Sequence, residues 1–171
     1  MTDKTTGQNN ISTAFNNVSG SGNIVLNLAA DNGIGFNLSG FSGDITVATG
    51  RLQVNTSTFN EASTIYLAAT GSELVFNSSC ELKNDVVLGA DTTFHVNKPS
   101  NAHYQGTISG DLLGEDRKLK KAGGSTLILK GRTELKTLET YAGQVIIDST
   151  SAYIEMVDGA MGDTAGGSLE L

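Results

Sequence analysis

Short pairs of apolar residues, separated by one intervening residue, recur along the chain. Alternation with a period of two places the apolar side chains on one side of an extended strand and the intervening ones on the other. The pattern therefore predicts an all-β chain of short strands, each with one buried side, and no long helix. The clearest pairs are Ile45/Val47, Leu52/Val54, Ile65/Leu67, Leu74/Phe76, Val86/Leu88, Phe94/Val96, Leu127/Leu129 and Val145/Ile147.

The pairs themselves recur at a nearly constant interval. Ile45 precedes Ile65 by 20 positions. Leu52 precedes Leu74 by 22 positions. A repeat of this length with two or three strands is typical of a β-solenoid, in which each coil buries its apolar side only by stacking on its neighbours. We therefore predict a β-solenoid with about 20 residues per coil and roughly seven or eight coils.

Three successive coils align closely at residues 44–55, 64–77 and 85–97. Each holds an apolar pair, a turn with Gly or Ala, a second apolar pair and a final asparagine. The alignment predicts that Asn55, Asn77 and Asn97 occupy one corner. Stacked asparagine side chains can hydrogen-bond to one another and to turn backbone, so the sequence predicts an asparagine ladder; the alternative is that asparagine is simply a common turn residue in this chain.

The repeat extends over most of the chain, so residues 1–171 are interpreted as one solenoid unit, part of a longer protein. Residues 1–17 are expected to form a flexible or capping N-terminal segment. Residues 98–105 contain the only proline, Pro99, and are expected to form a protruding loop, because proline cannot donate to a strand ladder. The last residues read as an interrupted strand, and unpaired strands at the ends of a solenoid favour end-to-end self-association.

Charge and composition exclude several classes of partner. The net charge of −7 would repel a phosphate backbone, so no nucleic-acid partner is expected. The basic cluster Arg117, Lys118, Lys120 and Lys121 follows two acidic residues and is interpreted as a mixed-charge, solvated strand edge. No stretch reaches the roughly 18 apolar residues of a membrane helix, so no direct membrane insertion by this segment is expected.

Candidate catalytic and metal-binding residues are few. Cys80 is the only cysteine and is interpreted as a structural residue, so neither a disulfide nor a cysteine-based metal site is expected. His95 lies between two inward-pointing positions and should therefore point outward. Residues 158–163 resemble a calcium-binding β-roll turn only once, without the required repeat. We therefore predict no catalytic residue, no metal and no cofactor.

Partner contacts are a different matter, because loops and exposed aromatic side chains commonly carry recognition. His103 and Tyr104 lie in the expected loop, and Tyr66 and Tyr153 alternate with apolar strand residues. His103, Tyr104 and Tyr66 are therefore the candidate partner contacts. The alternative for the tyrosines is packing against neighbouring coils.

One segment has a distinctive order of residues. Residues 108–148, ISGDLLGEDRKLKKAGGSTLILKGRTELKTLETYAGQVIID, resemble the autotransporter-associated β-strand repeat, also called the passenger-associated transport repeat. Residues 18–28 and 41–54 resemble a second, looser copy. The family's usual NTYTGGT stretch is reduced here to residues 139–143. The matching positions are Ile108, Gly110, Leu119, Lys121, Gly123 or Gly124, Leu127, Leu129, Gly131, Tyr141, Gly143, Val145 and Ile147.

The resemblance implies a right-handed parallel β-helix from the passenger of an autotransporter-like protein. Such a segment would be secreted or held at the bacterial cell surface, attached to the outer membrane through parts outside this chain. It would act as a non-catalytic structural or display segment that contributes to adhesion. Its expected partners would be a host or environmental glycan or a surface protein.

A second function stays open at this level. Polysaccharide lyases and glycoside hydrolases also use β-helices, with clustered carboxylates or a basic residue on one outer face. Glycoside hydrolysis needs two carboxyl groups about 5 Å or about 6.5–9.5 Å apart across one cleft. The acidic residues of this chain are scattered singly among the coils, so the fragment of a carbohydrate-active enzyme is the alternative rather than the leading hypothesis.

Overall fold

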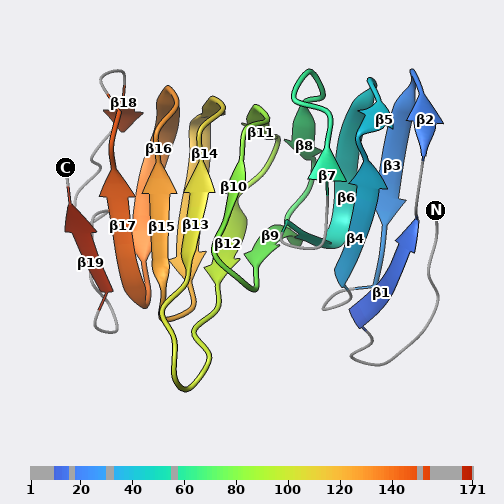
Figure 1. Ribbon diagram of the computed structural model, residues 1–171. Coiled ribbons are helices and arrows are strands. Elements are labelled where there is room, and N and C mark those ends of the chain that lie inside the picture. The colour runs from blue at the N-terminus through green and yellow to red at the C-terminus, as the bar shows by residue number, and fades with distance from the viewer. Residues whose placement is uncertain are drawn as a thin grey trace.

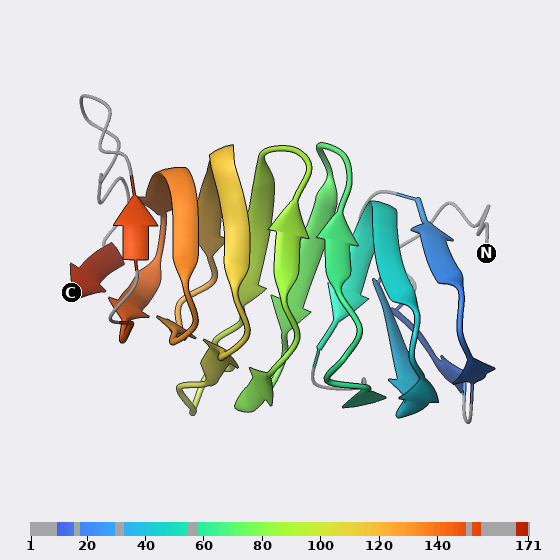
Figure 2. The same ribbon diagram turned by 90° about the horizontal axis from the view of Figure 1, so that it is seen from above.

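Parallel strands stacked side by side make up all the regular structure in the described part of the chain (Figure 1). The computed structural model describes residues 10–15, 18–29, 33–54, 58–149, 152–154 and 167–170. For residues 10–15, 152–154 and 167–170 it describes the backbone alone. Seen from above, the stack runs from the N-terminal to the C-terminal end of the molecule (Figure 2).

The strands follow one another around the axis in a fixed order and form three faces. Face A contains β3 (Asn23–Asn27), the start of β6 (Asp44–Gln53), β8 (Ile65–Leu67), β11 (Val86–Leu88), the starts of β14 (Leu112–Ala122) and β16 (Thr133–Thr140), and β18 (Ala152–Ile154). Face B contains β1 (Asn10–Phe15), β4 (Gly33–Leu38), the end of β6, β9 (Ser72–Phe76), β12 (Thr92–Val96) and the ends of β14 and β16. Face C contains β10 (Cys80–Leu82), β13 (Gln105–Ile108), β15 (Thr126–Leu129), β17 (Gly143–Ile147) and β19 (Gly167–Glu170).

Short strands complete the N-terminal turns. β2 (Ser19–Gly20) pairs with β5 (Gly40–Phe41), and β7 (Thr58–Phe59) pairs with the end of β4. β1 pairs with β4, so residues 10–15 belong to the sheet of face B. Residues 1–9 and 16–17, the rest of the expected N-terminal segment, lie outside the described residues.

The number of turns follows from the strand register on face A. Equivalent positions run through Ile24, Ile45, Ile65, Val86, Leu112, Thr133 and Ala152. The predicted β-solenoid is confirmed, with about 6 turns of about 21 residues each. The described residues form fewer turns than the seven or eight expected for the whole chain. The step from Val86 to Leu112 is lengthened by residues 97–104, which form no strand.

Inward-pointing side chains form continuous columns through the stack. On face A, Ile45, Ile65 and Val86 are fully buried. On face C, Leu82, Ile108, Leu129 and Ile147 are in register and buried. On face B the column is Ile34, Leu52, Leu74 and Phe94. Each such side chain contributes about 1.5–3 kcal/mol through burial, which explains why the period-two pattern determines the strands.

The corner that leads from face C to face A is packed backbone against backbone. A Cβ atom on Gly131 would lie 2.0 Å from the carbonyl oxygen of Gly110, and one on Gly110 would lie 2.3 Å from that of Asn84. Asp85 follows Asn84, and its Oδ1 accepts the backbone N–H of Asp111 at 2.8 Å. Asp111 in turn accepts the N–H of Arg132 at 3.0 Å. These aspartates link each turn to the next.

The asparagine corner lies at the far end of face B. The side-chain amide of Asn97 donates to Oδ1 of Asn77 in the preceding turn. Asn55, the third predicted member, lies outside the described residues. Beyond Asn97 the chain projects from the stack before it returns to β13, and Figure 1 shows this loop extending past the other turns. No helix in the described part of the chain is long and apolar enough to span a lipid bilayer.

Candidate binding groove

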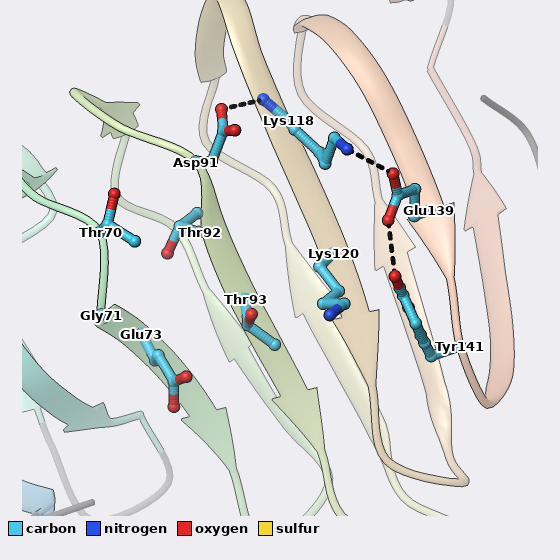
Figure 3. Close-up of a pocket in the computed structure, with 10 residues that line it drawn as sticks. All are labelled: Thr70, Gly71, Glu73, Asp91, Thr92, Thr93, Lys118, Lys120, Glu139 and Tyr141. Atoms are coloured by element: carbon cyan, nitrogen blue, oxygen red, sulfur yellow. Dashed lines mark hydrogen bonds and ion pairs between the residues drawn. The ribbon is translucent and has the colours of Figure 1, made fainter. Parts of the chain in front are cut away.

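An open groove of about 400 Å³ lies on the outer side of face B (Figure 3). It crosses the stack from β9 through β12 and β14 to the end of β16, so four turns contribute to it. It is lined by Thr70, Gly71, Glu73, Asp91, Thr92, Thr93, Lys118, Lys120, Glu139 and Tyr141. Charged and hydroxyl side chains predominate, and Tyr141 is the only aromatic residue in the lining.

Strand register places these side chains together. Arg51, Glu73, Thr93, Lys120 and Glu139 are successive partners across face B. Each alternates with an inward-pointing residue, so all five lie on the outer side. Neighbouring strands are about 4.8 Å apart, and the column therefore presents one polar side chain per turn at that interval.

Glu139 anchors one end of the groove. Its Oε1 accepts a hydrogen bond from Nζ of Lys118 at 2.7 Å, and its Oε2 accepts one from the Tyr141 hydroxyl at 2.9 Å. The hydrogen bond from Lys118 lowers the pKa of Glu139, assisted by Tyr141, and the same contact raises the pKa of Lys118. Figure 3 shows these three side chains joined in a row. The Glu139 carboxylate is therefore held ionised and fixed in position.

Glu73 anchors the opposite end. Its Oε2 lies 2.6 Å from Nε of Arg51 and 3.2 Å from Nε2 of His95. Burial pushes the pKa of Glu73 upward, but the contacts with His95 and Arg51 outweigh it, and the pKa is lowered. His95 does lie on the outer side of its strand, where its side chain is 25% exposed against this carboxylate.

Between the two anchors, Asp91, Thr93 and Lys120 surround the hollow. Oδ1 of Asp91 accepts the backbone N–H of Lys118 at 2.9 Å. Nζ of Lys120 lies 4.0 Å from the centre of the Tyr141 ring, a cation–π contact. Within the described part of the chain Lys120 makes no ion pair, so its ammonium keeps hydrogen-bonding capacity toward the groove.

The interpretation of the basic cluster as a solvated strand edge fits Arg117, which is exposed, but is wrong for Lys118, Lys120 and Lys121. β14 pairs with β12 on one side and β16 on the other, so it is not an edge strand. Lys118 and Lys120 are half-buried in the groove, and Lys121 is fully buried in the inward column next to Phe94. Alternation along the strand makes Lys120 and Lys121 point in opposite directions, which the count of charges alone could not reveal.

Lys121 is accommodated by backbone carbonyl groups at the next corner. Its Nζ donates to the carbonyl oxygen of Gly123 and, at 2.7 Å, to that of Ala142 in the following turn. Burial lowers the pKa of Lys121 to about 8. This lysine therefore joins two successive turns inside the core and does not reach the groove.

Glu73 and Glu139 do not have the spacing of a glycoside hydrolase's carboxylate pair. Glu73 and Glu139 are three strand spacings apart, roughly 14 Å, which is beyond the separation of a catalytic carboxylate pair. A general acid needs a raised pKa, whereas the pKa of each of these carboxyl groups is lowered. No group of three or more His, Cys, Asp or Glu side chains among the described residues could hold a metal ion. The arrangement is suited to binding through hydrogen bonds.

The predicted partner contacts lie elsewhere. Tyr66 is 37% exposed on the outer side of face A, and His103 is exposed in the loop before β13. Tyr104 packs against the core, and its backbone bonds to residues of the next turn. Cys80 is half-buried, and burial raises its pKa. The side chain of Tyr153 and residues 158–163 lie outside the described residues.

The groove residues are not evident from the sequence, because no cluster of like chemistry marks them. Glu73 and Asp91 are isolated acids along the chain, and the lysines belong to a run of charges that is expected to be solvent-exposed. The available signal was positional: outward-pointing residues of successive coils, taken at one register, predict neighbours across the sheet.

The class of fold is a parallel β-solenoid of about 6 turns. No protein-family model matches the chain, and no curated protein or solved structure is significantly similar to it. The geometry of the solenoid and of its groove therefore provides the grounds for a functional assignment.

Proposed function

We propose that this chain is a non-catalytic structural and display segment of an autotransporter-like protein, secreted or held at the bacterial cell surface. The observation that carries the proposal is the continuous core: among the described residues, inward columns run through about 6 turns. At about 4.8 Å per turn, such a stack forms a rigid body roughly 29 Å long. Rigidity and reach are what a display segment requires.

The residues of the passenger-type repeat support this reading, because their roles in the fold are structural. Ile108, Leu129 and Ile147 are buried in the column of face C. Gly131 permits the close backbone contact at a corner, and Lys121 joins two turns within the core. Right-handed winding and export through the outer membrane belong to the proposal through the same resemblance.

The alternative of a carbohydrate-active enzyme receives less support. Glu73 and Glu139 are too far apart to act together on one glycosidic bond, and both have lowered pKa values. A measurable loss of viscosity when the protein is incubated with a panel of polysaccharides, abolished by Asp91→Asn, would contradict the non-catalytic assignment.

Surface display is tested with the full-length gene expressed in a Gram-negative host. An epitope tag inserted at residues 98–105 should be labelled by antibody on intact cells and removed by added protease. An identical tag on a periplasmic marker protein serves as the control for cell integrity. Labelling that appears only after the outer membrane is permeabilised would refute display at the surface.

A further inference from the structure

The floor of the groove is set by a short side chain between two long ones. Thr93 lies between Glu73 and Lys120 in the outer column of face B. Thr70 and Gly71, at the neighbouring corner, have small side chains that do not fill the space above Thr93, so the hollow stays open there (Figure 3). A ligand would therefore lie across β9, β12 and β14, parallel to the solenoid axis.

The charges around the hollow largely cancel one another. Glu139 is paired with Lys118, and Glu73 is paired with Arg51. Asp91 and Lys120 bring one further charge of each sign, so three acids face three bases. A polyanion or polycation would gain no net attraction and would have to separate pairs that already exist, at a cost in desolvation. The groove favours a ligand without net charge.

The remaining hydrogen-bonding capacity is mixed. Lys120 can donate, and the second carboxylate oxygen of Asp91, which accepts no hydrogen bond within the described part of the chain, can accept. The hydroxyl of Thr93 can do both. A ligand that carries both donors and acceptors at close intervals satisfies this set, and hydroxyl groups on neighbouring carbons have that property.

The spacing of the column favours a repeating ligand. Outward side chains follow one another at about 4.8 Å, close to the length of one pyranose unit in an extended glycan. Three such intervals separate Glu73 from Glu139, which gives room for about two or three sugar units. The partly exposed Tyr141 lies at the far end, where an aromatic ring can contact the apolar face of a sugar.

We propose that the groove on face B binds an uncharged oligosaccharide of two or three pyranose units, aligned with the solenoid axis. Hydrogen bonds to Asp91, Thr93 and Lys120 hold its hydroxyl groups. The fixed carboxylates of Glu73 and Glu139 lie at the two ends of the site. This assignment deepens the proposed display function and rests on it, since a surface segment with such a groove can attach to a glycan without cleaving it.

Titration of ¹⁵N-labelled protein, followed by ¹H–¹⁵N correlation spectra, tests the site directly. The probes are cellotriose, maltotriose and triacetylchitotriose, with trigalacturonate as the anionic comparison. At least one neutral trisaccharide should shift the backbone signals of Thr93, Lys118 and Lys120, with a dissociation constant of about 1 mM, as expected for a shallow, open groove.

Two variants with matched controls assign the effect to the groove. Thr93→Tyr fills the floor and should weaken binding at least tenfold, whereas Thr107→Tyr, at an outward position on face C, should not. Lys120→Gln should weaken binding several-fold, whereas Lys136→Gln, exposed on β16, should not. A variant is compared only if its spectrum retains the signal dispersion of the native protein. If Thr93→Tyr unfolds the chain, Lys120→Gln and its control Lys136→Gln test the proposal alone.

Three results would overturn the proposal. The first is that no neutral trisaccharide shifts the signals of face B at concentrations up to about 20 mM. The others are that trigalacturonate binds more tightly than every neutral probe, or that Thr93→Tyr and Lys120→Gln both bind the trisaccharide as tightly as the unmodified protein. Surface labelling of the tagged protein is independent of these results, so the display function can stand when the groove assignment fails. New reducing-end signals in the same samples would instead refute the non-catalytic assignment.

Discussion

Replacing Gly131 by alanine tests whether the corner between faces C and A controls the stacking of turns. The added Cβ would lie 2.0 Å from the carbonyl oxygen of Gly110, 2.5 Å from its carbonyl carbon and 3.0 Å from the backbone nitrogen of Asp111. All three atoms are backbone, so no side chain can rotate away. The two turns must separate locally.

The expected loss follows from the contacts at that corner. Lys130 N–H donates to Ile108 and Leu112 N–H donates to Arg132, each at 2.8 Å, on either side of the clash. Weakening these two backbone hydrogen bonds costs about 1 kcal/mol each, and overpacking adds about 1–3 kcal/mol. Alanine also lowers the conformational entropy of the unfolded chain, which offsets about 0.4–1 kcal/mol of this loss. The free energy of unfolding should therefore fall by about 2–5 kcal/mol.

Urea denaturation followed by circular dichroism measures the change. Gly40→Ala is the matched control, because a Cβ there would make only an ordinary contact of 3.5 Å with Ser19. The control should change the free energy of unfolding by less than about 0.5 kcal/mol. A Gly131→Ala variant as stable as the control would refute the argument that backbone contact fixes the distance between turns.

Two further predictions concern the inward column of face B. Phe94→Ala removes a fully buried ring and should lower the free energy of unfolding by about 3–5 kcal/mol. Tyr66→Ala, at an exposed position on face A, should lower it far less. Urea denaturation of the two variants measures both changes. Burial lowers the pKa of Lys121 to about 8 from 10.5, so between these values the unfolded chain binds the proton that the folded chain has lost. Stability should therefore rise by up to about 3 kcal/mol as the pH increases from 8 to 10.5, and Lys121→Met should remove that rise; equal pH slopes for both proteins would contradict it.

The fold was predictable because its two periods are visible in the chain. The spacing of Ile45 and Ile65 reports one turn, and the alternation within each pair reports the inward side. The number of turns was harder to predict, since corners and the loop at residues 97–104 change the length of a turn without leaving a hydrophobic signal. Register, rather than chain length, determines the count.

Local sequence likeness did not always indicate an equivalent position. Residues 41–47 and 141–147 share the order aromatic, small, Gly, polar and alternating aliphatic, and read as copies of one module. In the structure the first segment enters β6 on face A, whereas the second enters β17 on face C. Both are corners followed by a strand, so the motif specifies a kind of local geometry that recurs within a turn.

The groove was harder to predict than the fold, for a related reason. Glu73, Thr93 and Lys120 are 20 and 27 positions apart, and they become neighbours only through exact register across face B. The longer of these intervals contains the loop, so a fixed period of 20 would have aligned Thr93 with Leu113, a residue of face A. An insertion in one turn therefore hides which side chains share a surface.

The loop at residues 97–104 also bears on how such a chain can change over time. It adds length to one turn, yet strands on both sides keep their partners: Asn97 still bonds to Asn77, and Ser109 N–H still bonds to Leu82. Loop closure becomes only slowly less favourable with length, by about 0.6 kcal/mol per doubling. Corners of this solenoid can therefore acquire new segments by insertion, and a lineage could diversify what it presents while its scaffold stays unaltered.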